Sequence, residues 1–218
     1  MIRKTYHQSL EELKQDVLKM GDMAKKAIHD SVQSLAKQDK ELAAKVIEEY
    51  DPLVDKMEFE IENKCMKLIA LQQPMAGDLR VIGTCMKMIT DLDRMSDLAT
   101  NIAEITLATA DKPLVKPLID IPRMSELTLE MLEDSLKAFA TYDARLVGSV
   151  SDKDDIVDAL YDQVRRELIT LMIEDPHTIG GASHLSFAAS HIERMADHAC
   201  NIAGRVVYMV TGERVKLG

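Results

Sequence analysis

The stretch that decides the fold occurs twice, first as Asp93-Arg94-Met95-Ser96-Asp97-Leu98-Ala99-Thr100-Asn101-Ile102-Ala103 and again as Glu193-Arg194-Met195-Ala196-Asp197-His198-Ala199-Cys200-Asn201-Ile202-Ala203. The copies lie 100 positions apart and share Arg, Met, Asp, Ala, Asn, Ile and Ala at the same offsets, after a leading acid. A duplicated fold must repeat its buried apolar positions, but packing does not require it to repeat carboxylates outside the core. The pattern therefore indicates both a duplicated fold and a repeated use of its acids.

The duplication extends beyond this stretch. Matching segments are Met20-Gly21-Asp22 with Met124-Ser125-Glu126, Asp51 and Asp55 with Asp154 and Asp158, and Gln73-Pro74 with Asp175-Pro176. Residues 111–122 contain three of the six prolines and are predicted to form a linker. We therefore expect a first three-helix repeat over 1–110, the linker over 111–122 and a second repeat over 123–218.

Apolar spacing predicts the secondary structure of each repeat. The first helix is indicated by Leu10, Leu13, Val17, Met20, Ala24, Ala27 and Leu35, whose alternating spacing of three and four is typical of an amphipathic helix. Further helices are expected over 39–71, where Pro52 marks a kink or a restart, and over 78–110. The fold predicted is all-α, with six long helices in two tandem antiparallel three-helix bundles, side by side or end to end.

Composition excludes several classes of function. The net charge of −10 argues against a nucleic-acid binder. Three cysteines without a Cys-x-x-Cys pair indicate buried thiols in a reducing compartment. The N-terminus lacks an apolar signal segment, and no stretch is apolar enough to cross a membrane. We expect a soluble cytoplasmic protein that meets membranes only through partners.

The repeated acids lie beside the core stripe of their helices. Because successive helical residues turn by about 100°, Glu193 and Asp197 lie about 100° and 140° from Ile192, with Asn201 near 180°. The candidate metal-binding residues are Asp93, Asp97, Asn101, Glu193, Asp197 and Asn201. Acids expected on neighbouring helices are Asp22, Asp51, Asp55, Glu58 and Glu62, with Glu126, Asp154 and Asp158 in the second half. Such oxygen ligands could bind a divalent or trivalent cation.

An alternative interpretation of the acids stays open. Acids spaced four apart usually belong to a solvated face, and Arg94 and Arg194 stand where each could pair with the following Asp. Such a pair contributes only about 0.3–0.5 kcal/mol. Recurrence of acid, Asp and Asn in both halves favours the metal site over this alternative.

Other features point less clearly to function. His177, His184, His191 and His198 recur every seven residues and predict a histidine edge on the last helix. Successive members would lie about 10.5 Å apart, too far to share a metal ion. We recognise no nucleotide fingerprint and no catalytic triad, so the sequence argues against an enzyme.

At these motifs the chain resembles the PhoU family, the regulators associated with bacterial high-affinity phosphate transport. The resemblance is carried by the duplicated acid-Arg-Met-x-Asp pattern, by Leu71-x-x-Pro74-x-x-x-Asp78-Leu79-Arg80, by Glu174-Asp175-Pro176 and by Val207-Tyr208-x-x-Thr211-Gly212-Glu213. It runs nearly from end to end of the chain.

The resemblance implies a fold, a role and a ligand set. The fold would be two similar three-helix bundles. Asp93 and Asp97, then Glu193 and Asp197, would hold metal clusters of iron or zinc, with Asn101 and Asn201 as further donors. The role would be negative regulation of phosphate-starvation signalling, as an adaptor between the phosphate ABC transporter's ATPase subunit and a sensor histidine kinase. A homodimer is compatible with it.

Two other classes of function remain as alternatives. The first is a carboxylate-bridged metalloenzyme on a helical bundle, which would need inward-facing acids and at least one His ligand. The second is a structural helical scaffold whose acids provide solubility.

Overall fold

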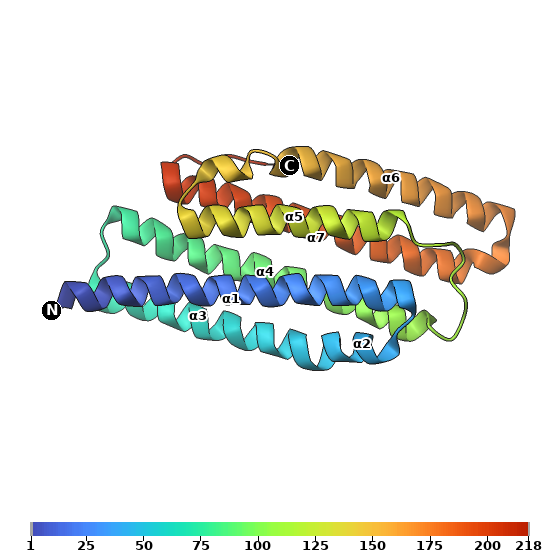
Figure 1. The fold of residues 1–218 in the computed structure, drawn as a ribbon, viewed down its shortest axis with the longest axis horizontal. Helices are drawn as coiled ribbons and strands as arrows, with labels where there is room; N and C mark the ends of the chain where they lie inside the picture. Colours follow the sequence, from blue (N-terminus) through green and yellow to red (C-terminus); the bar gives the residue numbers. More distant parts are fainter. Residues whose placement is uncertain (1, 218) are drawn as a thin grey trace.

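The structure, a computed structural model, describes residues 2–217, which form two helical bundles lying side by side (Figure 1). The helices are α1 (Ile2–Lys37), α2 (Lys40–Lys45), α3 (Asp51–Gln72), α4 (Ala76–Thr109), α5 (Asp120–Thr141), α6 (Val150–Glu174) and α7 (Ile179–Thr211). Residues 2–217 contain no strand. The predicted all-α fold of two three-helix bundles is confirmed, with α2 and α3 together serving as the second helix of the first bundle.

The two bundles join along α4 and α7, the pair of helices with the most extensive contact in the molecule. α1 and α5 provide a second contact between the bundles, while α3 and α6 lie at their outer sides (Figure 1). The side-by-side arrangement is therefore the one adopted. As a result, each repeated motif lies on a helix that contacts both its own bundle and the other one.

The apolar residues of the repeated motif form the centre of this core. Met95 and Ile102 of α4 are fully buried, as are Met195 and Ile202 of α7. Burial of side chains of this size supplies about 1.5–3 kcal/mol each relative to exposure. The repetition of these positions thus follows from packing alone.

Pro52 follows an irregular turn within the second helix of the first bundle. A π-helical turn, η1, spans Val46–Tyr50, and α3 starts at Asp51 with Pro52 in its first turn. Proline has no backbone N–H to donate to the preceding turn, and a local π turn accommodates this loss. The sequence predicted a kink or a restart at Pro52, and the structure has a π turn directly before it within a continuous helical segment over residues 40–72.

The connection between the bundles is held against the second one. α4 ends at Thr109 and α5 begins at Asp120, within the last residues of the predicted linker. Lys116 in this connection forms an ion pair with Glu167 of α6. A Cβ at Gly181 would come within 2.6 Å of the Val115 side chain, so glycine permits this close approach.

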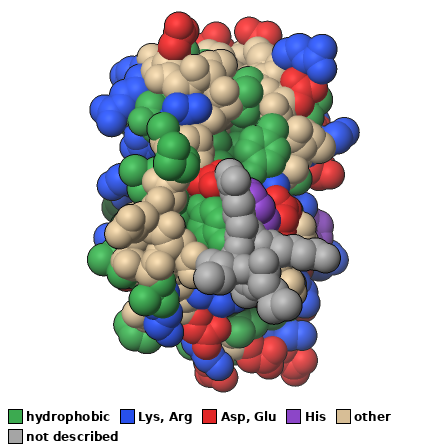
Figure 2. All heavy atoms as spheres, turned by 90° about the vertical axis from the view of Figure 1, so that its left-hand side faces the viewer, with side chains coloured by type: hydrophobic (Ala, Val, Ile, Leu, Met, Phe, Trp, Pro, Cys, Tyr) green, Lys and Arg blue, Asp and Glu red, His purple; other side chains and the backbone are tan. Residues whose placement is uncertain are grey.

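Two further observations bear on the surface. No helix within residues 2–217 is long and apolar enough to span a membrane. Figure 2 shows the end of the molecule where α1 begins, with acidic and basic side chains interspersed around exposed hydrophobic ones. The described part of this end therefore presents no surface of a single charge sign.

Candidate functional site

The first acid cluster, defined as Asp51, Asp55, Glu58, Asp93 and Asp97, lies between α3 and α4. Asp93 is half-buried, and its burial is the main reason why the pKa of its carboxyl rises from 3.8 to about 7. The negative charges of Glu58, Asp97 and Asp55 raise it further, whereas Arg94 opposes them. The helices thus hold like charges together at the edge of the core.

Two residues of α3 in this cluster, Asp51 and Glu58, show the same effect. Burial raises the pKa of Asp51, and the charges of Asp55 and Asp97 add to this rise. Ser96 donates a hydrogen bond to Asp51 at 3.4 Å and partly offsets it. Burial also raises the pKa of Glu58, with added repulsion from Glu62 and Asp55.

The second acid cluster, defined as Asp154, Asp158, Glu193 and Asp197, lies between α6 and α7. Asp154 is buried, and this burial raises the pKa of its carboxyl despite a hydrogen bond with Cys200. Burial also raises the pKa values of Asp158 and Glu193, and Asp197 repels both carboxyls. The two clusters therefore occupy corresponding positions in the two bundles, each between an outer helix and a helix of the joint.

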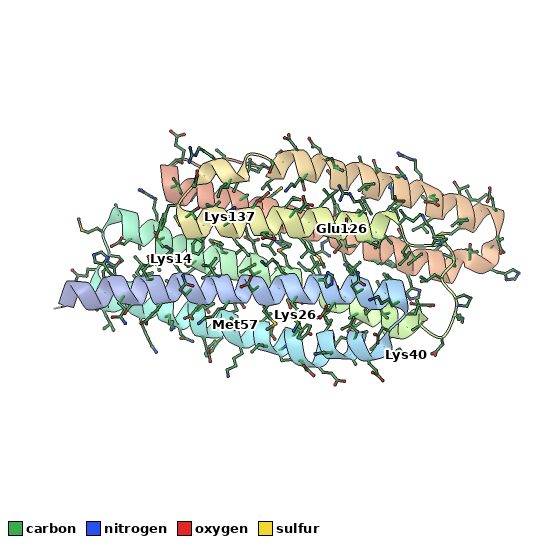
Figure 3. The ribbon with its side chains drawn as sticks, in the orientation of Figure 1. Lys14, Lys26, Lys40, Met57, Glu126 and Lys137 are labelled. Carbon is green, nitrogen blue, oxygen red and sulfur yellow. The ribbon has the colours of Figure 1, made fainter. Side chains whose placement is uncertain are left out.

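Of the acids proposed from the sequence on neighbouring helices, some lie in or beside the two clusters and others do not. Asp51, Asp55, Glu58, Asp154 and Asp158 join the clusters, and Glu62 borders the first one. Asp22 lies on α1, where it pairs with Lys25 at 2.9 Å. Glu126 lies on α5 (Figure 3), where it pairs with Arg123 at 3.2 Å. The last two acids therefore form ion pairs within their own helices.

The two asparagines line other pockets. Asn101 borders a pocket between α4 and α7 that includes His184 and His191. Asn201 borders a pocket that the C-terminal segment forms against α7. Each pocket brings its asparagine beside residues that belong to neither acid cluster.

The alternative interpretation of the repeated acids expected an Arg–Asp ion pair in each copy of the motif. The structure contains this pair in the first copy. Arg94 Nη1 donates to Asp97 Oδ2 at 2.9 Å, with both side chains substantially exposed. Among residues 2–217, no corresponding pair joins Arg194 to Asp197. The pairing therefore does not explain why both acids recur.

The predicted histidine edge is only partly correct. His177 lies in a 3₁₀ turn, η3 (Pro176–Thr178), because Pro176 precedes α7. His184 Nδ1 contacts the Gly180 carbonyl oxygen at 2.8 Å, and burial lowers the pKa of His191. His198 Nδ1 lies 2.9 Å from Asp91 Oδ1 of α4. The four histidines therefore make separate contacts and do not form one continuous edge. His198 of α7 contacts Asp91 of α4 and so joins the two bundles.

Sequence reasoning missed Asp155, whose charge raises the pKa values of its neighbours Asp154 and Asp158. The sequence feature that could have identified Asp155 is the run Asp152-Lys153-Asp154-Asp155 at the start of α6. Such a run is also typical of an acidic helix N-terminus, so its position alone did not separate the two roles.

The donor chemistry of both clusters suits hard cations, since carboxylate oxygens are the ligands those ions prefer. However, no group of three or more His, Cys, Asp or Glu side chains within the described part of the chain is placed to hold a metal ion. The clusters are thus concentrations of negative charge whose side chains would have to move closer together around a cation.

Comparison with known proteins gives a consistent result. The family model described as PhoU domain matches residues 17–106 and again 121–206. A protein of Aquifex aeolicus, called a phosphate-specific transport system accessory protein PhoU homolog, is 46% identical over 95% of this chain and 93% of its own length. A Clostridium acetobutylicum protein with the same description is 38% identical over 100% of this chain and 99% of its own length.

Solved structures agree with the sequence matches. PhoU from Pseudomonas aeruginosa superposes with a TM-score of 0.91 at 33% identity and covers 95% of this chain and 100% of its own. The phosphate transport system regulatory protein PhoU from Streptococcus pneumoniae gives 0.90 at 32% identity, covering 97% of this chain and 100% of its own. By its duplicated motif, its paired bundles and these matches, the chain belongs to the PhoU family.

Proposed function

We propose that this protein is an accessory protein of a phosphate-specific transport system that restrains phosphate uptake and phosphate-starvation signalling. The observation that supports it most strongly is the near full-length match to relatives described as accessory proteins of that system. In this proposal the chain acts in the cytoplasm as a non-catalytic adaptor. It joins the transporter's ATPase subunit to a sensor histidine kinase.

We further propose that the two acid clusters bind metal ions, iron or zinc. Supporting this, burial and mutual repulsion raise the pKa of Asp93 to about 7 and raise that of Glu193. A bound cation would offset both effects, because an opposite charge favours the ionised form of a carboxyl. Asp93, Asp97, Glu193 and Asp197 would provide oxygen ligands from α4 and α7.

Partner capture tests the adaptor role. The full-length protein is immobilised on a resin and incubated with a membrane extract from phosphate-replete cells. It should retain the transporter ATPase subunit or the sensor kinase. A variant carrying Asp97→Asn and Asp197→Asn shows whether this retention needs the clusters. Recovery of neither partner by the folded wild-type protein would contradict the adaptor role.

Elemental analysis tests the metal proposal independently. Protein purified without chelator should contain iron or zinc, and the Asp97→Asn/Asp197→Asn variant should lose most of it. The matched control is Asp22→Asn/Glu126→Gln, which removes two exposed acids from α1 and α5 and should keep the metal. Equal metal content in all three proteins would refute binding at the clusters.

The metalloenzyme alternative gains no support from the described residues. It expects a histidine among the carboxylate ligands, whereas the charged side chains that act on Asp93 and Glu193 are Asp, Glu and Arg. The relatives are described as transport accessory proteins, which also favours the adaptor.

A further inference from the structure

The C-terminal segment turns back onto α7 and closes a small pocket. The turn occurs at Gly212, whose φ of +80° suits glycine. The chain then returns along the bundle (Figure 1). A Cβ at Gly204 would lie only 3.1 Å from the Val215 carbonyl oxygen, so the missing side chain lets the segment lie close to the helix. The corresponding position in the first half is Glu104, which would not allow the same approach.

The polar lining of this pocket is mainly cationic. Its volume is about 130 Å³, and its polar side chains are Asn201, Arg205 and Tyr208 from α7 with Arg214 and Lys216 from the segment. At about 30 Å³ per water molecule, that is room for roughly four waters. A volume of this size matches an ion of five heavy atoms.

Within residues 2–217, these three cations have no acidic partner. Among residues 2–217, no ion pair involves Arg205, Arg214 or Lys216. The Nε of Arg205 is buried without a hydrogen-bond partner in the same residues. Asp154 contacts Cys200 at the edge of the pocket but does not line it. The whole chain carries a net charge of −10, so a cluster of three cations around one pocket is opposite in sign to the protein's overall charge.

A buried polar group without a partner costs free energy, and a charged one costs more. Arginine presents a planar set of donors that matches oxyanions, while lysine adds a point charge. The Arg214 guanidinium carbon lies 5.7 Å from the centroid of the Tyr208 ring, a distance at which the ring attracts the cation. We propose that this pocket binds a compact oxyanion of the phosphate or sulfate type, held by Arg205, Arg214 and Lys216.

This proposal does not depend on the adaptor role or on metal binding, and titration of the full-length protein tests it. Inorganic phosphate should bind saturably by calorimetry and shift the Nε–Hε resonance of Arg205 in NMR spectra. Sulfate should compete with it. Glycerol 3-phosphate distinguishes the sources: weaker binding than phosphate indicates a free ion, and stronger binding indicates a phosphate monoester such as a lipid headgroup.

Substitutions localise the effect. Arg205→Gln and the exposed pair Arg214→Gln/Lys216→Gln should each weaken phosphate binding at least about tenfold, as expected when charge-assisted hydrogen bonds are lost. Gly204→Glu should do the same by displacing the segment and adding a carboxylate. Arg166→Gln, which removes an exposed arginine of α6, should leave binding unchanged.

Two outcomes would overturn the proposal. One is the absence of saturable phosphate or sulfate binding by the wild-type protein. The other is wild-type affinity in the Arg214→Gln/Lys216→Gln variant, which alters only exposed side chains and should fold normally by circular dichroism. If Arg205→Gln fails to fold, the exposed pair still decides the question.

Discussion

Asp93 shows how one side chain responds to its surroundings. Its carboxyl is half-buried beside Glu58 and Asp97, and its pKa rises to about 7 because burial and like charges both disfavour ionisation. In the unfolded chain the carboxyl returns to its ordinary pKa near 3.8. Between these values the folded protein holds a proton that the unfolded chain releases. The stability that Asp93 contributes is therefore complete below about pH 4 and is lost as the pH rises through about 7.

The substitution Asp93→Asn removes the ionisable carboxyl and should therefore remove this loss of stability at high pH. In metal-free protein we expect the variant to be more stable than wild type by about 1 kcal/mol at pH 8, a value discounted for partial exposure. At pH 4 the difference should be close to zero. Urea unfolding at both pH values measures it, with Asp162→Asn as a control that removes an exposed acid paired with Arg165. A gain of the same size at both pH values would contradict the assigned cause.

At the scale of the element, α4 and α7 combine two faces with different roles. Their apolar face carries the repeated Met, Ile and Ala positions and is fully buried. Their flank toward α3 or α6 carries the repeated acids. Because side chains on one helix keep a fixed angular relation, burying the apolar face brings the acids to the edge of the core.

The substitution Ile202→Ala tests the apolar face. Ile202 is fully buried in α7, so we expect a loss of about 2–5 kcal/mol in the free energy of unfolding from lost burial and the cavity left behind. Ile173→Ala in α6 is the matched control, because Ile173 is 76% exposed and should change stability by no more than about 0.5 kcal/mol. Denaturant unfolding compares the two variants, and equal losses would refute the assignment of this core.

At the scale of the whole molecule, polar contacts reinforce the apolar joint between the bundles. His198 of α7 meets Asp91 of α4 at 2.9 Å, and both side chains are mostly buried. On the other pair of helices, Lys14 of α1 (Figure 3) is nearly buried, with its Nζ 4.2 Å from the centroid of the Tyr142 ring at the end of α5. Such contacts select one alignment of the bundles, since sliding the helices would separate the partners.

A double-mutant cycle on His198→Ala and Asp91→Ala should give a coupling of about 1–2 kcal/mol in unfolding free energy. The comparison is the cycle on Arg94 and Asp97, an exposed pair within α4, for which about 0.3–0.5 kcal/mol is expected. A coupling near zero for His198 and Asp91 would show that the contact does not help to join the bundles.

Periodicity and duplication by themselves determined the helices, the core face of α4 and α7 and the two acid pairs, because each depends on neighbours within one helix. The irregularity beside Pro52 was predictable for the same reason. Tertiary structure alone decided that the bundles lie side by side and that Asp154 rather than Glu126 meets the second acid pair. It alone placed Arg205 against the returning C-terminal segment. These outcomes depend on which distant surfaces pack together, and the angular position of a residue on its own helix does not specify its neighbours.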